Sequence, residues 1–384
     1  MRGTLRKRGD TWSYQLKHQD ATRPSGRRYE SKGGFRTKKE ATEALNQALA
    51  AHDPANPIEP SRQSFAAYVN TEWLPGLHGV KPSTRSNYRL LLDAYILPSL
   101  GSVALRDVTA RHLEGLYTRL RNDGRTRGQG GLSESSVHKV HVAISKILGD
   151  AAESGLIRSN PATKVTRRIK PKAGSSPEMK VWTREELGRF LASIEGNRLQ
   201  PLLGFAVATF LRRGEICGLR WEDVDLDRGT LAVRRARVAC AGHIEEGVPK
   251  SGRARTVSLD PGTVAALRRW RSIQLQERLA WGDAWTDSGY LFTREDGHPL
   301  NPQTLAGEYR RLVRQSGVPV IRFHDLRHTG ATLALADGVP VKVVSERLGH
   351  ASIQITYDVY AHVIPGMQQE AAVRIGGLVW GVAQ

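Results

Sequence analysis

Apolar residues in the middle of the chain recur every three or four positions, which is the spacing of one face of an α-helix. Three such series are present: Tyr88, Leu91, Leu92 and Tyr95; Leu113, Leu116 and Leu120; and Val137, Val140, Ile144 and Ile147. Ser83 and Ser133 precede the first and third series and are good helix caps. The pattern predicts a helical bundle over residues 62–165, with these apolar residues in its core.

The N-terminal segment follows a different pattern. Apolar and polar residues alternate over positions 12–16, as expected for a strand, and the glycines in 32–35 predict a turn. Thr37 is placed to cap a helix over residues 38–50. We expect a small α+β domain over residues 1–52, and a flexible basic arm is the alternative.

Two segments of linker composition divide the chain. Residues 52–61 contain three prolines, which make a connection stiff, and residues 167–172 carry four positive charges in six positions. They separate three predicted domains, at residues 1–52, 62–165 and 178–384.

The third domain combines helices with a few strands. Residues 231–233 and 256–259 read as strands on either side of a turn that holds Lys250. Three helix starts carry capping residues: Thr183 with Glu186, Asp260 before Pro261, and Asn301 before Pro302. The expected fold class is multidomain and mainly α with small β-sheets: an α+β N-terminal domain, a helical bundle, and a mixed α/β, mostly helical third domain.

The charge of the chain points to a polyanionic partner. Net charge is +19 and the sequence pI is near 10.2. Residues 1–50 alone hold 12 Lys and Arg against 5 Asp and Glu. Such an excess is typical of proteins that bind nucleic acid, and scattered surface charge is the plainer alternative.

Other classes of protein find no support in the sequence. The two cysteines, Cys217 and Cys240, form no disulfide framework or zinc cluster and suit a reducing compartment. The longest apolar stretch, near residues 202–211, is too short for a membrane span, and no secretory signal is expected at the N-terminus. We expect a cytoplasmic protein.

Six polar residues are candidates for chemistry on a phosphodiester: Arg212, Lys250, His324, Arg327, His350 and Tyr360. Each has a common alternative, such as a surface ion pair for Arg212 or a core aromatic for Tyr360. Together they suit one reaction, the attack of a tyrosine on a phosphodiester of the DNA backbone. A phenol has a pKa of about 10 and is a poor nucleophile at pH 7, but two nearby guanidinium groups stabilise both the phenolate and a pentacoordinate phosphorus.

The order of these residues resembles the tyrosine recombinase (phage integrase) family. The resemblance extends through Leu219-Arg220-Trp221, His324-Asp325-Leu326-Arg327, Leu348-Gly349-His350 and Tyr360-Ala361-His362-Val363. It is strongest over residues 180–375, while residues 62–165 resemble the helical core-binding domain of the family, and residues 1–50 resemble the arm-binding domain of its larger members.

The resemblance implies a role for each candidate. Arg212 and Arg327 would clamp the scissile phosphate, and Lys250 would protonate the 5′-hydroxyl leaving group. His324 would assist proton transfer from the nucleophile, and His350 would hydrogen-bond the phosphate. Tyr360 would attack and leave a 3′-phosphotyrosyl link, so that no metal, ATP or other cofactor is needed.

The resemblance also implies a location, associated with the nucleoid of a bacterial host cell, and it implies partners. The protein would integrate a phage or other mobile element, and with help excise it, acting as a homotetramer on double-stranded attachment sites. A host DNA-bending factor and an excisionase are possible further partners. The apolar C-terminal segment from Met367 to Trp380 would dock on a neighbouring subunit or on its own domain.

Two features leave questions open. Tyr357 competes with Tyr360 as nucleophile, and the Tyr-Ala-His-Val sequence favours Tyr360. Phe210 stands where the family usually has glycine, which predicts an effect on activity through the placement of Arg212. Two rival functions also remain, a type IB topoisomerase and a DNA-binding regulator without catalysis.

Overall fold

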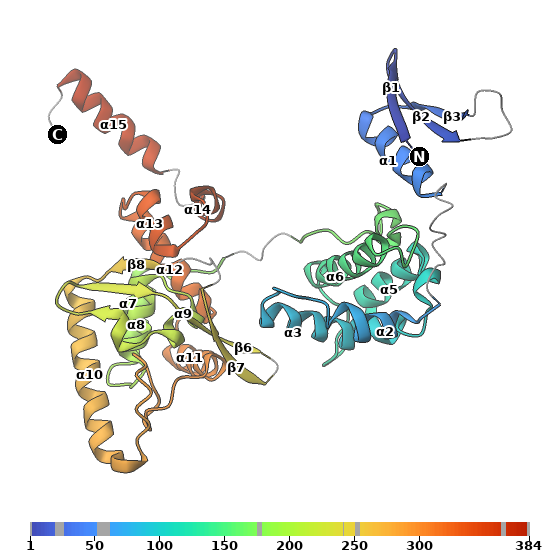
Figure 1. The fold of residues 1–384 in the computed structure, drawn as a ribbon. Helices are drawn as coiled ribbons and strands as arrows, with labels where there is room; N and C mark the ends of the chain where they lie inside the picture. Colours follow the sequence, from blue (N-terminus) through green and yellow to red (C-terminus); the bar gives the residue numbers. More distant parts are fainter. Residues whose placement is uncertain are drawn as a thin grey trace. The chain divides into compact units, whose positions relative to one another are not determined.

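The computed structural model describes residues 2–19, 27–51, 62–174, 179–240, 242–249, 254–361 and 366–381. The chain divides into two compact units, residues 1–78 with 91–174 and residues 79–90 with 175–384 (Figure 1). No helix in the described part of the chain is long and apolar enough to cross a membrane.

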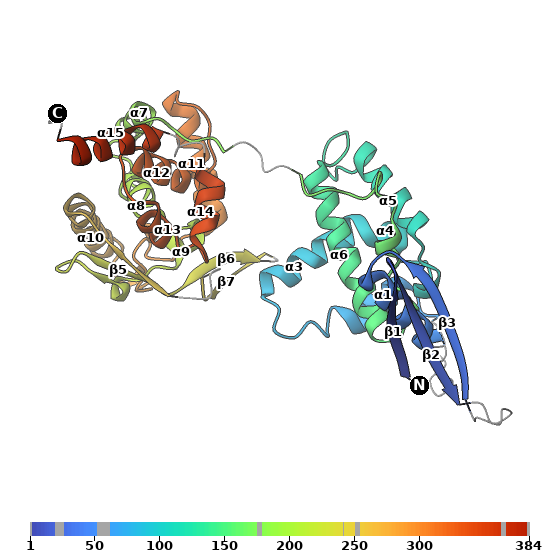
Figure 2. The same cartoon turned by 90° about the horizontal axis from the view of Figure 1, so that it is seen from above.

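The N-terminal domain is a three-stranded antiparallel sheet with one helix, as predicted. Its elements are β1 (Arg2–Arg8), β2 (Thr11–Gln19), β3 (Arg27–Phe35) and α1 (Lys38–Ala51), with β2 in the centre of the sheet (Figure 2). Tyr14 and Leu16 of β2 pack against Leu45 of α1. The Thr37 hydroxyl accepts a hydrogen bond from the Glu40 amide at 3.2 Å, so the predicted cap is confirmed.

The turn predicted at residues 32–35 is wrong, because these residues lie within β3. Ser13 pairs with Gly33 but Trp12 pairs with Phe35, so Gly34 is an extra residue in a β-bulge. Gly34 has φ +93°, which glycine adopts without steric cost. The same glycines therefore serve a bulge where local rules indicate a turn.

The middle of the chain is helical, as predicted. Its elements are α2 (Phe65–Tyr68), η1 (Val69–Trp73), α3 (Pro82–Leu91), η2 (Leu92–Ile96), α4 (Leu97–Leu100), η3 (Leu105–Asp107), α5 (Ala110–Asp123), α6 (Glu134–Glu153) and η4 (Pro161–Lys164). The predicted apolar series on α5 and α6 are buried. In the first series Leu91 and Leu92 are buried, whereas Tyr88 and Tyr95 are half-buried.

The second unit contains more helices than strands. Besides α3, nearly all of which belongs to this unit, the helices are α7 (Arg184–Ser193), α8 (Gln200–Thr209), α9 (Arg213–Gly218), η5 (Trp221–Asp223), α10 (Pro261–Trp281), η6 (Gly282–Ala284), α11 (Pro302–Ser316), α12 (Phe323–Ala336), α13 (Val341–Leu348), α14 (Ile353–Tyr360) and α15 (Gly366–Trp380). The strands are β4 (Val224–Asp225), β5 (Thr230–Val233), β6 (Ala236–Cys240), β7 (His243–Gly247) and β8 (Arg255–Ser258). Helix α8 packs against both α10 and α12 and forms the centre of the unit (Figure 1).

The two predicted strands are confirmed as β5 and β8, which are antiparallel neighbours with Leu231 opposite Val257. The hairpin of β6 and β7, which lies between them in the sequence, was not expected. Its second strand is polar and largely exposed, so it carries no alternating pattern. The side-chain caps at Thr183, Asp260 and Asn301 are all present.

Candidate active site

Five of the six predicted site residues lie at the ends of helices or on one helix of the second unit. Arg212 precedes α9, His324 and Arg327 are on α12, His350 follows α13, and Tyr360 ends α14. These elements meet beside a small apolar cluster that includes Phe210, Val344 and Tyr360. The sixth residue, Lys250, lies outside the described residues, in the connection between β7 and β8.

A buried carboxylate orients Arg212. Glu215, one turn into α9, accepts hydrogen bonds from the Arg212 amide at 3.0 Å and from its Nη1 at 2.9 Å. Arg255 at the start of β8 donates to both oxygens of the same carboxylate, at 3.1 and 2.8 Å. Burial alone would raise the pKa of Glu215, but Arg255 and Arg212 outweigh it and lower the pKa. Glu215 is therefore a charged anchor for two arginines.

Arg327 is held by two backbone carbonyls. Its Nη1 donates to the Phe210 carbonyl at 2.6 Å and its Nη2 to the Leu348 carbonyl at 2.7 Å. The side chain is almost fully buried, and burial together with the nearby charge of Arg212 lowers the pKa of Arg327 to about 9. Carbonyls do not neutralise a guanidinium, so a bound anion would stabilise this charge.

The two predicted histidines are neutral at physiological pH. The pKa of His324 is lowered to about 4, first by the protein packed around its ring and then by the charges of His328 and Arg327, although one side of the residue is exposed. The pKa of His350 also falls to about 4, because of burial and then Arg327 and Arg212. His350 Nδ1 lies 2.9 Å from the Thr356 hydroxyl, which fixes the ring.

The two candidate tyrosines differ in environment. Tyr360 is fully buried, and burial raises its pKa to about 12 despite the opposing charge of Arg327. Tyr357 is 41% exposed on the same helix. The charge of Arg327 acts against this rise in the Tyr360 pKa, so Tyr360 lies close to the arginine.

His328 is a site residue that the sequence does not single out. Its Nδ1 lies 2.8 Å from the Tyr360 hydroxyl oxygen. His328 lies one helical turn after His324, and the two rings are 5.0 Å apart between centroids. The spacing of four residues on a helix was the available signal, because such residues share a face.

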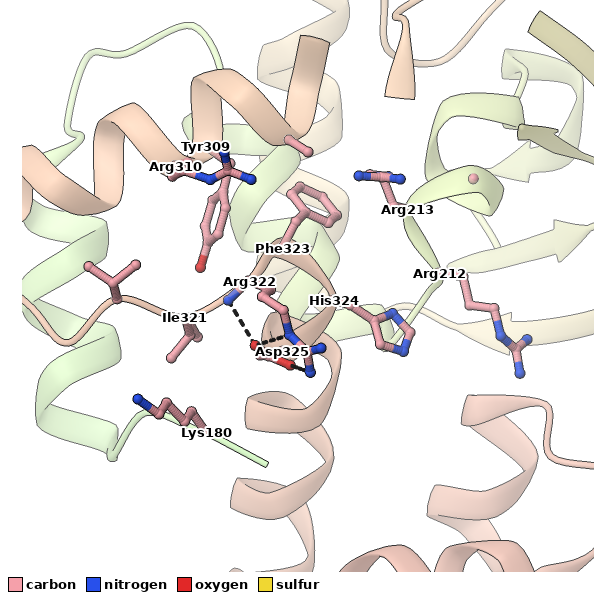
Figure 3. Close-up of a pocket in the computed structure, with 13 residues that line it drawn as sticks. Lys180, Arg212, Arg213, Tyr309, Arg310, Ile321, Arg322, Phe323, His324 and Asp325 are labelled. Atoms are coloured by element: carbon pink, nitrogen blue, oxygen red, sulfur yellow. Dashed lines mark hydrogen bonds and ion pairs between the residues drawn. The ribbon is translucent and has the colours of Figure 1, made fainter. Parts of the chain in front are cut away.

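A basic cavity of about 790 Å³ opens beside these residues (Figure 3). Arg212 and His324 line it, together with four further cations: Lys180, Arg213, Arg310 and Arg322. Arg322 donates to both oxygens of Asp325, at 3.0 and 2.8 Å, so it is partly neutralised. The cavity suits a polyanion, whereas Tyr360 is fully buried and is not among the residues that line it. No group of histidine, cysteine and acidic side chains among the described residues could hold a metal ion.

Phe210 takes the backbone conformation that glycine would adopt. It ends α8 with φ 57° and ψ 26°, and it is the one non-glycine residue with positive φ among those described. Space for its ring exists because α12 carries Gly330, where an added Cβ would lie 2.7 Å from the ring and 2.3 Å from the Val207 carbonyl. Arg347 covers the ring at 5.3 Å. The carbonyl of Phe210 still reaches Arg327.

We expect Phe210→Gly to lower stability without raising the cleavage rate. Losing a buried phenyl ring costs about 3–5 kcal/mol, and relief of the left-handed conformation returns about 1–2 kcal/mol. Phe210→Ala loses the ring and keeps the strain. The free energy of unfolding should therefore be highest for wild type, lower for Phe210→Gly and lowest for Phe210→Ala. Urea unfolding and single-turnover cleavage measure both effects. Faster cleavage by the glycine variant would show instead that Phe210 displaces the arginines.

Comparison with known proteins defines the class of this enzyme, the tyrosine recombinases, which break and rejoin DNA strands. The chain belongs to the phage integrase family, whose sequence profile matches residues 180–366. The profile of an arm DNA-binding domain matches residues 4–51, and that of the phage integrase N-terminal SAM-like domain matches residues 68–121. The protein is thus a site-specific tyrosine recombinase.

Known relatives span most of the chain. A tyrosine recombinase XerC-like protein of Caldanaerobacter subterraneus subsp. tengcongensis is 29% identical over 78% of this chain and 78% of its own length. An integrase of Streptomyces ambofaciens is 27% identical over 92% of this chain and 90% of its own length.

Solved structures share the fold. The Tn1549 transposon integrase in complex with a circular intermediate DNA matches with a TM-score of 0.67 and 19% identity, over 81% of this chain and all of that one. A lambda integrase dimer bound to a COC′ core site matches with a TM-score of 0.56 and 19% identity, over 93% of this chain and 94% of that one.

Proposed function

We propose that Arg212 and Arg327 bind the scissile phosphate of a DNA attachment site and that Tyr360 attacks it. The bond from phosphorus to the 5′ oxygen breaks, and a bond from phosphorus to the tyrosine oxygen forms. His350 donates a hydrogen bond to the phosphate, and His324 assists proton transfer from the nucleophile. The bond energy is kept in the phosphotyrosyl link, so rejoining needs no other energy source.

The observation that carries this proposal is the environment of Arg327. Its guanidinium is buried, bound by neutral carbonyls only, and close enough to both Arg212 and Tyr360 for their charges to affect its pKa. Glu215 compensates only part of the positive charge of Arg212, Arg255 and Arg327, and the remaining excess favours the binding of an anion. A phosphate between the two arginines would supply that anion next to the tyrosine.

Lys250 is proposed as the general acid that protonates the leaving 5′ oxygen. Its place in the chain supports this, because it lies in the connection that joins the polar hairpin strand β7 to β8, and β8 also carries Arg255 of the Glu215 network. A lysine can give a proton to a leaving oxygen, which is the role that this step requires.

We further propose that the domains at residues 1–52, 62–165 and 178–384 bind the arm sites, bind the core site and perform catalysis, respectively. The match of residues 4–51 to an arm DNA-binding domain supports the first assignment. Lambda integrase, a structural neighbour, has been solved as a dimer bound to a COC′ core site and as a tetramer bound to a Holliday junction. A homotetramer on DNA, a host DNA-bending factor and an excisionase are the proposed partners. Because the complex is driven by cationic contacts to phosphates, log affinity should fall with log salt concentration by about 0.9 per contact.

A nicked suicide substrate carrying the core site tests the assignment. The nick lets the short leaving strand diffuse away, so the enzyme stays covalently attached and moves more slowly on a denaturing gel. We expect an adduct with wild-type protein and none with Arg327→Ala. Absence of an adduct with the wild type on its own attachment site would support the non-catalytic regulator. Relaxation of plasmid without that site would support the topoisomerase.

A further inference from the structure

The hydroxyl of Tyr360 makes its hydrogen bond with His328, not with the histidine that the sequence pointed to. His328 Nδ1 is 2.8 Å from the tyrosine oxygen, and the two ring centroids are 5.8 Å apart. His324 is one turn earlier on α12 and lines the basic cavity. The two histidines therefore occupy different places, one at the cavity and one at the nucleophile.

The direction of this hydrogen bond follows from burial. Tyr360 is fully buried, and a buried hydroxyl that donates to no acceptor loses the free energy of its hydrogen bond with water. Among the described residues, His328 Nδ1 is the acceptor in reach. Burial raises the pKa of Tyr360 to about 12 and lowers that of His328, so the phenol is protonated and the imidazole is neutral. The tyrosine thus donates, and Nδ1 accepts.

The surroundings allow His328 to take a charge briefly. Asp325, on the same helix, favours the charged imidazole, while Arg327 and Arg322 oppose it. From other elements, Tyr360 of α14 contacts the ring, and His350 after α13 lies close enough to interact with its charge. A phosphate bound at the arginines would add negative charge beside the ring and favour the imidazolium further.

We propose that His328 is a catalytic residue that accepts the Tyr360 proton during strand cleavage and returns it during rejoining. The inference rests on the proposed function, in which Tyr360 is the nucleophile. As the oxygen of Tyr360 bonds to phosphorus, its proton passes to Nδ1 of His328, and the electron pair of the broken bond leaves with the 5′ oxygen, which takes a proton from the general acid. His324, in contact with His328, then assists indirectly.

Two substitutions separate proton transfer from simple packing. His328→Asn places an amide oxygen near the position of Nδ1, so it accepts the same hydrogen bond but does not take the proton. His328→Ala removes both the hydrogen-bond acceptor and the group that takes the proton. We expect both variants of the full-length protein to form the covalent adduct about 10²–10⁴-fold more slowly than wild type. Added imidazole should partly restore the alanine variant. DNA affinity and melting temperature check that each variant is folded.

A modified substrate adds an independent readout. With sulfur in place of the bridging 5′ oxygen, the leaving thiolate needs no proton, so Lys250→Ala should recover its rate. The His328 variants should stay slow, because their defect concerns the attacking oxygen. Wild-type cleavage by His328→Asn, or recovery of the His328 variants on the sulfur substrate, would overturn the proposal. A wild-type protein that forms no adduct would instead overturn the proposed function.

Discussion

Tyr360→Phe is expected to abolish the covalent adduct, and Tyr357→Phe is expected to leave it. Phenylalanine keeps the ring that packs beside Val344 and Leu348, so the fold should be retained while the attacking oxygen is lost. Tyr357 is 41% exposed, and removing its hydroxyl changes little in the core. The pair is a matched test, because both residues lie on α14 and lose the same atom.

The measurement is adduct formation on the nicked core-site substrate, with DNA affinity as the control for folding. Tyr360→Phe should bind DNA as wild type does, because the Tyr360 side chain is fully buried and does not line the basic cavity. Its one cost in the free protein is the lost hydrogen bond to His328, about 1 kcal/mol. A covalent adduct that persists in Tyr360→Phe and disappears in Tyr357→Phe would reverse the assignment.

Glu215→Gln should have the second largest effect, on stability and cleavage together. Glu215 is 1% exposed and binds both Arg212 and Arg255. Removing one partner from a buried ion pair costs about 3–5 kcal/mol, because the remaining charge is left without compensation. Arg212 would also lose the contact that orients it. Urea unfolding and adduct formation should both show the loss.

Glu308→Gln provides the control. Glu308 forms an exposed ion pair with Arg311, so this substitution should cost less than about 1 kcal/mol.

The difference in the free energy of unfolding between wild type and Glu215→Gln should also depend on pH. The pKa of Glu215 is lower in the folded protein, so its contribution is complete above the unfolded pKa of about 4.3 and is lost as pH falls through the folded pKa. If this difference in the free energy of unfolding does not shrink in acid, the charge of Glu215 is not its source.

Local patterns determined much of the fold. The caps at Thr37, Thr183 and Asp260 depend on residues within one turn, so the sequence suffices to find them. Gly34 shows the limit of such rules. Its positive φ was implied by the residue type, but whether it serves a turn or a bulge depends on pairing with a strand about 20 residues earlier in the chain.

For the site, too, the sequence indicated some features and left others to be decided by the structure. Residue order alone pointed to Arg212, His324, Arg327, His350 and Tyr360, because the chemistry of phosphoryl transfer requires those side chains. Their roles stay predictions, as does that of Lys250. The domain bounds at residues 52, 62, 165 and 178 also stay predictions, while residues 1–78 and 91–174 form one compact unit in the structure.

The sequence by itself determined the local elements, since these depend on residue type and short spacing, and its resemblance to a known family indicated the class of enzyme. Tertiary structure decided which groups meet. The contact of Phe210 with Gly330 joins α8 to α12, and that of His328 with Tyr360 joins α12 to α14. Each pair is far apart in the chain, and helix packing alone brings its members together. A spacing rule based on one helix does not contain that information.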